Sequence, residues 1–552
     1  MNGILHKTHQ RVMGEKTRST HWQQIFDVSG LILFSLCLYL LDDYLTGLMQ
    51  AHHLAWMFRD EYRTDRSSLA VITLLYLFIV WVIYCWASFR SAKPVRIILC
   101  AFFVLSVFIE YGYFSTFNRW MTSVDLWTAA LSPWSLWTEA IGMYFNKSAL
   151  LMAAIFTAAV ALNWRKPRSK ALPEVILLVC LIGTWVYRTY LPFDRIVGSS
   201  VFQYTHLLED IRPADRLFGS RIDVPQISTS RPANNIILVI DESLRGDHLS
   251  INGYGRDTTP TLQKLKDEGL VTNWGIAVSS ATCSVFSNPH ILTGVPSTPG
   301  TDNRLTSHWP TIFQYARAMG YKTYYLDAQA NYLWNGLLTS DLTYVDVHMT
   351  TDDFTATMHS DKNAAMYIRQ LITGSTGNFI VLNKMGMHIL YENNYPPSEA
   401  HWLPTPPDRD YKHNPTLVIN AYDNALHYNL ETFFQTLMPD LKELPNTLIV
   451  YTSDHGDTLQ EHGETWSHCH NTDPEAMVPL FIVGKLDHSV DTGYSASHVN
   501  IMPTILDLMQ VPESKRSQTY ALSLLSAEAS LGEKRYFIDG DLQSVQYKSR
   551  SQ

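Results

Sequence analysis

Long apolar runs alternate with polar breaks in the first 192 residues of this 552-residue chain. Five runs stand at residues 25–41, 69–89, 95–109, 149–162 and 175–190. A helix needs roughly 20 mainly apolar residues to cross a bilayer, and the last two runs reach that length only with their aromatic flanks. A soluble core helix would carry a polar face, which whole turns of these runs lack. The pattern therefore predicts five membrane spans, with buried core helices as the alternative.

Basic residues stand at one end of each predicted span and set the orientation of the set. They precede the first run, separate the second from the third and separate the fourth from the fifth: Lys7, Arg11, Lys16, Arg18; Arg90, Lys93, Arg96; Arg165, Lys166, Arg168, Lys170. Because basic loops stay cytoplasmic, the amino terminus is expected inside and everything after residue 190 outside. Arg59, Arg63 and Arg66 conflict with this orientation, although acidic residues interleave with them.

Four tryptophans gather in the loop at residues 115–147. Amphipathic aromatic rings favour the headgroup zone of a membrane. The loop is expected to lie at the outer membrane surface, or alternatively to pack against the second domain.

A different pattern begins after a proline-punctuated stretch. Short β-branched runs at residues 235–240, 321–326, 378–382 and 447–452 alternate with helical patterns that include 258–267 and 420–437. Such alternation predicts an α/β domain whose mostly parallel sheet is covered by helices on both faces, with the active site beyond the carboxyl ends of the strands. The expected division is a transmembrane domain at 1–192, a linker at 193–234 and an α/β domain at 235–552.

Charge separates the two parts further. The chain carries a net charge of -9, which divides into +6 for residues 1–192 and -15 for the rest. An acidic outer domain disfavours a nucleic-acid partner. An apolar share of 46% excludes a disordered chain, and six cysteines in this length exclude a small disulfide scaffold.

Two predicted strands end in residues that suit a metal ion. Asp241 and Glu242 close the first strand, and Asp454 and His455 follow the last one, before Gly456. Carboxylate and imidazole donors together favour zinc over manganese or magnesium. Two adjacent ligands can face one ion only where the strand breaks, and Gly456 is expected to permit that bend.

Several segments resemble the membrane phosphoethanolamine transferases of the alkaline phosphatase and sulfatase superfamily, most closely the lipid A-modifying branch. They lie in the family's order at residues 235–262, 279–289, 420–426, 451–459, 478–481 and 498–506. The resemblance implies an alkaline phosphatase-like domain behind five spans. It also implies a zinc-dependent enzyme of the bacterial inner membrane with a periplasmic catalytic domain.

The resemblance also assigns site residues. It makes Glu242, Asp454, His455 and Thr282 the zinc ligands and Thr282 the nucleophile. The alternative for Thr282 is a helix-capping hydroxyl, and Ser284 is then the reserve nucleophile.

Two histidines are implied to contact the phosphoryl or ethanolamine group. They are His388 and His468, with His470 as the alternative to His468 because the spacing from His455 is one residue longer than in the family.

Two departures from the family pattern leave alternatives open. Asp241 replaces a usual glycine, so it is expected either to bind a second divalent metal or to face away from the first. Cys283 and Cys469 are the only cysteines outside the apolar runs, where the family commonly has several disulfides. They are expected either to bond to each other in an oxidising compartment or to flank the site as free thiols.

The implied reaction moves phosphoethanolamine from phosphatidylethanolamine to an envelope glycolipid or glycan, lipid A first, through a covalent intermediate on the nucleophile. One rival is a membrane-tethered phosphodiesterase or sulfatase; sulfatases need a Cys/Ser-x-Pro-x-Arg sequence, and the segment after Cys283 lacks its proline and arginine. The other is a non-catalytic lipid-binding protein, which would have no need of Glu242, Thr282, Asp454 and His455 together.

Overall fold

The computed structural model describes residues 30–38, 40–41, 44, 67–117, 146–162, 175–179, 221–329, 337–354, 360–406, 414–461, 466–531, 534–540 and 543–548. The first and fifth predicted spans, the tryptophan-rich loop and the linker fall partly or mostly outside these residues. The chain divides into two compact units, Met1–Arg212 and Pro213–Gln552. Each unit is described by itself.

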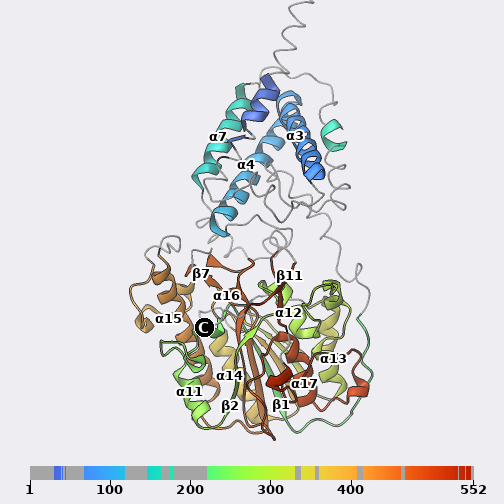
Figure 1. Ribbon diagram of the computed structural model, residues 1–552, viewed down its shortest axis with the longest axis vertical. Coiled ribbons are helices and arrows are strands. Elements are labelled where there is room, and N and C mark those ends of the chain that lie inside the picture. The colour runs from blue at the N-terminus through green and yellow to red at the C-terminus, as the bar shows by residue number, and fades with distance from the viewer. Residues whose placement is uncertain are drawn as a thin grey trace, which may run out of the picture. The chain divides into compact units, whose positions relative to one another are not determined.

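Among the described residues of the amino-terminal unit are three long apolar helices, α3 (Ser67–Arg90), α4 (Lys93–Phe117) and α7 (Lys147–Leu162). They contain the second, third and fourth apolar runs, and α4 packs against both of the others (Figure 1). Phe103 of α4 stacks on Phe156 of α7 with ring centroids 4.0 Å apart. Outward-facing Ile98 and Leu105 are 65% and 60% exposed. Within the described residues, one helix has the length and composition to cross a membrane, at Lys93–Tyr113; the number of spans stays a prediction.

A seven-stranded sheet forms the centre of the carboxy-terminal unit, in the order β2-β9-β6-β1-β5-β3-β4. Its strands are β1 (Asn235–Asp241), β2 (Val271–Val278), β3 (Lys322–Asp327), β4 (Val347–Met349), β5 (Asn378–Asn383), β6 (Thr447–Ser453) and β9 (Met477–Val483). Six of these strands run in the same direction, and β9 runs in the opposite direction between β2 and β6. The predicted, mostly parallel sheet is confirmed.

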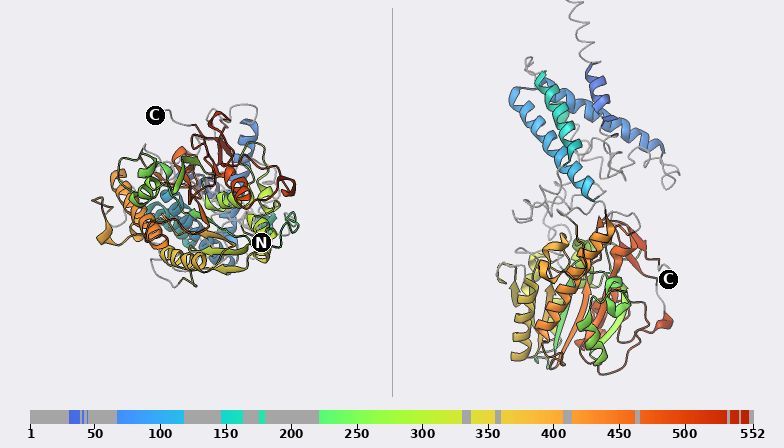
Figure 2. Two further views of the ribbon diagram at one scale, coloured as in Figure 1. Left: turned by 90° about the horizontal axis from the view of Figure 1, so that it is seen from below. Right: turned by 90° about the vertical axis from the view of Figure 1, so that its left-hand side faces the viewer.

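Helices cover both faces of the sheet, as Figure 1 shows. One layer contains α11 (Pro260–Asp267), α14 (Ser360–Gly374) and α15 (Pro415–Leu437), and the right-hand view of Figure 2 looks onto α14 and α15. The other contains α12 (Ser284–Thr293), α13 (Ile312–Ala318) and α17 (Ile501–Leu508). Alternate side chains of β1 account for this arrangement, because Ile236, Leu238 and Ile240 join the buried cluster that includes Phe313 and Ile505.

Short elements complete the unit near the carboxyl ends of the central strands. They are the hairpins β7 (Thr458–Leu459) with β8 (Trp466–Ser467) and β10 (Tyr536–Ile538) with β11 (Ser544–Gln546), and the single turn α16 (Asp473–Ala476). Val278, at the end of β2, packs with Ala476 and Phe537 in a small buried cluster. These elements surround the edge at which parallel strands place functional residues.

Candidate metal centre and active site

Glu242 and Asp454 lie side by side because β1 and β6 are paired in parallel. Asp241 is in register with Ser453, so the next residue of each strand emerges at the same edge. Oδ1 of Asp454 accepts hydrogen bonds from the backbone N–H groups of Ser243 at 3.1 Å and His455 at 2.8 Å. These bonds leave Oδ2 of Asp454 buried with no hydrogen-bond partner among the described residues.

Nitrogen and oxygen donors converge beside that unpaired oxygen. Nε2 of His455 lies 3.5 Å from Oδ2 of Asp454 and 3.6 Å from Oε1 of Glu242. One ligand atom from each of Glu242, His455 and His468 falls within 4.8 Å of the other two. Nδ1 of His455 donates to the Gly456 carbonyl at 2.9 Å, which turns Nε2 toward the cluster. These residues fit a divalent cation in donor type and spacing.

The electrostatics of the cluster also favour a cation. Burial raises the pKa of the Glu242 carboxyl well above its usual range, and the nearby Asp454 raises it further. Burial alone would lower the pKa of His455, but Asp454 and Glu242 outweigh burial and raise it to about 9. Two buried carboxylates this close repel one another unless positive charge lies between them, and a divalent ion supplies that charge.

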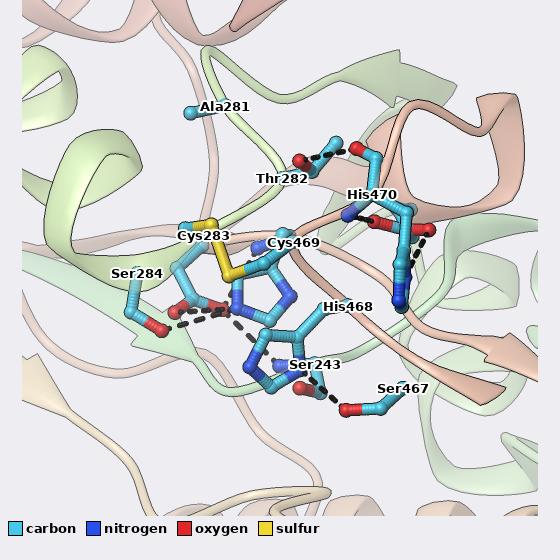
Figure 3. The surroundings of a disulfide bond; sticks show 12 residues. Ser243, Ala281, Thr282, Cys283, Ser284, Ser467, His468, Cys469 and His470 are labelled. Atoms are coloured by element: carbon cyan, nitrogen blue, oxygen red, sulfur yellow. Dashed lines mark hydrogen bonds and ion pairs between the residues drawn. A yellow bond between two sulfur atoms is a disulfide. The ribbon is translucent and has the colours of Figure 1, made fainter. Parts of the chain in front are cut away.

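Ser284 brings a hydroxyl group to the cluster. It is the first residue of α12, where free backbone N–H groups favour an anion. Its Oγ lies 3.1 Å from Nε2 of His455 and 3.5 Å from Oε2 of Glu242 (Figure 3). This hydroxyl is therefore placed to meet both a metal ion and a phosphoryl group.

The structure does not bring the Thr282 hydroxyl to the metal cluster, contrary to the role that the resemblance implied. Thr282 is fully buried, and its Oγ1 donates to the backbone carbonyl of His470 at 2.9 Å. Its backbone N–H bonds to the Ile538 carbonyl. The extended residue Cys283 separates the two hydroxyl-bearing residues, and the reserve residue Ser284 occupies the position expected of Thr282.

Of the two alternative histidines, His468 and not His470 lies at the cluster. The His468 ring centroid is 4.2 Å from that of His455. The pKa of His468 is lowered by burial and by the charge of His455. His470 instead pairs with Glu475, its Nδ1 lying 3.1 Å from Oε1 of that residue.

His388 lies in the loop after β5, partly exposed, and its Nδ1 donates to the Ile389 carbonyl at 2.8 Å. Its assignment to the phosphoryl or ethanolamine group stays a prediction.

Asp241 faces away from the cluster. Its Oδ2 pairs with Nζ of Lys384 at 2.8 Å and accepts a hydrogen bond from the Tyr451 hydroxyl. Its Oδ1 accepts from the backbone N–H of Glu242 at 3.0 Å. Asp241 and Lys384 are both almost fully buried, so the pair supports the metal-binding edge from behind. Asp241 was expected either to bind a second divalent metal or to face away from the first, and the geometry favours the side chain that faces away.

Gly386 explains how the Lys384 loop can pass so close to this edge. Its φ is +51°, and a Cβ there would lie 2.1 Å from Oδ1 of Asp241 and 2.8 Å from the Glu242 nitrogen. Gly456 does not have the positive φ that the expected bend would need. It allows the chain to pass close to the Pro474 carbonyl, because a Cβ there would lie 2.6 Å from that oxygen. The β6 strand simply ends at Ser453, before the two ligand-type residues.

Two residues at the site were missed by the sequence reasoning. Nε2 of Gln329 donates to Oε2 of Glu242 at 2.9 Å, and Oδ1 of Asp457 accepts from Nδ1 of His468 at 2.9 Å. The sequence held a signal that could have identified both residues. Gln329 follows a predicted strand, and Asp457 stands three residues after Asp454, within a segment already singled out.

Comparison with known proteins agrees with this architecture. A family model described as sulfatase matches residues 234–511. The integral membrane lipooligosaccharide phosphoethanolamine transferase A of Neisseria meningitidis has a similar fold, with a TM-score of 0.59 and 17% identity over 86% of this chain and 95% of that one. The expected fold is thereby confirmed: a helical unit is followed along the chain by a sulfatase-like α/β unit with a mostly parallel sheet.

Curated relatives of the chain include phosphoethanolamine transferases. EptC of Escherichia coli K12 is 23% identical over 365 residues, which cover 59% of this chain and 62% of the relative. The Kdo(2)-lipid A phosphoethanolamine 7''-transferase of Salmonella typhimurium is 24% identical over 255 residues, 44% of this chain and 42% of the relative. The chain thus spans less than two thirds of the length of these relatives. The sulfatase model covers half of the chain, and the chain belongs to the sulfatase family.

Proposed function

We propose that the protein transfers phosphoethanolamine from phosphatidylethanolamine to a glycolipid or glycan of the cell envelope, with Ser284 as the nucleophile. The observation that carries the proposal is the Ser284 hydroxyl at the start of α12, 3.1 Å from Nε2 of His455 within a buried, metal-type cluster. The similarity to phosphoethanolamine transferases supplies the substrate class.

The ion would be held by Glu242, Asp454 and His455, with His468 within reach. The carboxylate and imidazole donors of these residues favour zinc. A zinc ion there would lower the pKa of the nearby hydroxyl and stabilise negative charge on the phosphoryl oxygens. Gln329 and Ser243 each donate to a different oxygen of Glu242, which fixes the plane of its carboxylate.

The transfer takes place in two displacements. Oγ of Ser284 attacks the phosphorus of the donor, and the bond from phosphorus to the diacylglycerol oxygen breaks as the Oγ–P bond forms. The serine proton passes, with His468 as carrier, to the departing diacylglycerol. An acceptor oxygen then attacks the phosphorus and loses its proton, and Ser284 recovers its hydroxyl as the Oγ–P bond breaks. Imidazole is suited to both proton transfers.

A membrane location suits this donor, because its acyl chains can stay in the bilayer while the headgroup reaches the site. The apolar helices α3, α4 and α7 support an anchor in the inner membrane, and the basic loops favour a periplasmic catalytic unit. Lipid A is the first acceptor to test, because one relative is by name a Kdo(2)-lipid A phosphoethanolamine transferase.

Sulfate ester hydrolysis is not the function that this site supports. The sequence after Cys283 lacks the proline and arginine of the sulfatase motif, and Cys283 itself is bonded to Cys469. Ser284 is also followed by Val285 and Phe286 rather than by that motif.

The test is a transfer assay with purified full-length protein in vesicles of phosphatidylethanolamine carrying a labelled headgroup. Lipid A, a core oligosaccharide and a periplasmic glucan are supplied in separate reactions. Label should move to one acceptor in wild type and to none in Ser284→Ala. Release of the label to water alone, whichever acceptor is present, would instead identify a phosphodiesterase.

A further inference from the structure

The Cys283–Cys469 disulfide joins the two segments that carry the reactive side chains. Cys283 directly precedes Ser284, and Cys469 directly follows His468, as Figure 3 shows. The two cysteines are 186 residues apart in the chain, and their Cα atoms are 4.8 Å apart. Of the two states expected for these cysteines, the structure has the bonded one. The bond therefore closes a long loop at positions adjacent to Ser284 and His468, the two catalytic candidates.

Two hydrogen bonds run beside the disulfide between the same segments. The backbone N–H of Cys469 donates to the Thr282 carbonyl at 2.8 Å. The Thr282 hydroxyl donates to the His470 carbonyl at 2.9 Å. Thr282 thus contributes to the connection between the segments rather than to the metal cluster.

The backbone around His468 is held in an unfavourable conformation. Ser467 and Cys469, on either side of His468, have φ values of +80° and +67°. Residues other than glycine adopt this region at a cost of order 1–3 kcal/mol each and stay there only when their surroundings impose it. The β7–β8 hairpin next to His468 pairs only two residues on each strand. The short hairpin alone gives little support to this conformation.

The segment that carries Ser284 is anchored more firmly. Ser284 begins a ten-residue helix, and the backbone N–H of Thr282 bonds to the Ile538 carbonyl. His468 is fixed by its bond to Asp457 and by the disulfide that follows it. The disulfide is the covalent element that ties the weakly supported segment to the firmly supported one.

We infer that the Cys283–Cys469 disulfide is a positioning element of the active site: it holds His468 opposite Ser284, and transfer requires the bond to be intact. The inference rests on the proposed function, because it assigns Ser284 and His468 to the same reaction. A small dithiol would open the bond by supplying two electrons and two protons, which leaves two cysteine thiols and an oxidised dithiol. A misplacement of about 1 Å at a reactive group can lower a rate roughly 100-fold.

The first experiment compares transfer by oxidised and reduced full-length protein. Dithiothreitol is used as the dithiol, and the state of Cys283 and Cys469 is verified by peptide mass. We expect reduction to lower kcat at least tenfold and reoxidation to restore it. A variant with alanine at Cys37, Cys85, Cys100 and Cys180 should respond as wild type does, because those cysteines lie outside the catalytic unit. Cys283→Ala/Cys469→Ala should be slow and insensitive to dithiothreitol.

The second experiment reads the position of the segments without activity, by hydrogen exchange of the same samples. Reduction should lower protection at residues 466–471 while β1 and β6 stay protected. Unchanged exchange at 466–471, or full turnover by protein with two verified thiols, would overturn the inference. Loss of protection throughout β1 and β6 would also overturn it, because the bond would then support the whole domain. Oxidised protein that transfers no label would contradict the proposed function instead, and the exchange data would still decide the role of the disulfide.

Discussion

Nδ1 of His468 donates to Oδ1 of Asp457 across 2.9 Å. Asp457 is fully buried, and its other oxygen accepts from the Tyr391 hydroxyl at 2.7 Å. Burial alone would raise the pKa of Asp457, but its bonds to His468 and Tyr391 and the charge of His455 lower it. An ionised carboxylate can only accept, so it keeps the proton of a neutral His468 on Nδ1 and leaves Nε2 free to bind a metal or take up a proton.

Asp457→Asn is expected to slow transfer by about 10- to 100-fold, because an amide can donate to Nδ1 and so favour the other tautomer of His468. Steady-state kinetics with labelled phosphatidylethanolamine measure this loss. Tyr391→Phe, which keeps the Asp457–His468 bond, is the matched control and should lose much less. Equal rates for wild type and Asp457→Asn would show that Asp457 does not position His468.

Metal binding should depend on the carboxylates at the ends of β1 and β6. Asp454→Asn and Glu242→Gln each remove a charged donor, and we expect the bound zinc per chain, measured by elemental analysis after dialysis, to fall to less than half. Glu443→Gln is the control, since Glu443 is 45% exposed and pairs with Lys485. Undiminished zinc in both site variants would mean that the ion lies elsewhere.

The buried pair of Asp241 and Lys384 gives a prediction about stability. Lys384→Met leaves the Asp241 carboxylate buried without its partner, which typically costs about 3–5 kcal/mol. Asp241→Asn/Lys384→Met removes both charges and should recover most of that loss. The free energies of unfolding of wild type and both variants are compared in denaturant. A double variant as unstable as Lys384→Met would argue against a stabilising ion pair.

His290 should make the catalytic unit sensitive to acid. It is buried, and burial lowers its pKa from 6.5 to about 4, although its bond to the Val295 carbonyl opposes the shift. A folded-state pKa below the unfolded one means that this contribution is fully present above pH 6.5 and is lost as the pH falls toward 4. The difference corresponds to about 3 kcal/mol.

His290→Asn keeps a donor for the Val295 carbonyl but cannot titrate. Its free energy of unfolding should therefore fall less than that of wild type between pH 7 and pH 4. Parallel pH profiles for the two proteins would show that His290 does not contribute to the acid sensitivity.

Four central strands of the sheet, β1, β3, β5 and β6, were predictable because they are almost fully buried and form short apolar runs, whereas β2, β4 and β9 were not predicted. The run at residues 235–240 became β1, Asn235–Asp241, and the run at 447–452 became β6, Thr447–Ser453. The same reasoning located Glu242, Asp454 and His455, since the carboxyl ends of parallel strands meet at one edge. In the amino-terminal unit the runs predicted helices, whereas the number of spans depends on residues outside those that the structure describes.

The choice among neighbouring side chains could not be read from the sequence. Thr282 and Ser284 stand two residues apart at the start of α12, and only the pairing of residues 282–283 with 469–470 turns the Thr282 hydroxyl away from the cluster. Likewise, the partner of Asp241 is Lys384, 143 residues away. Such long-range contacts decide which way a side chain faces, and a local motif carries no information about them.

The central claim is that Ser284 carries the phosphoethanolamine group between donor and acceptor. The most direct test incubates the full-length protein with labelled phosphatidylethanolamine in the absence of acceptor and measures the mass of the peptide that contains residues 282–284. We expect an adduct with the mass of phosphoethanolamine on Ser284 in wild type and Thr282→Val, and none in Ser284→Ala. An adduct on Thr282, or one that persists in Ser284→Ala, would contradict the account.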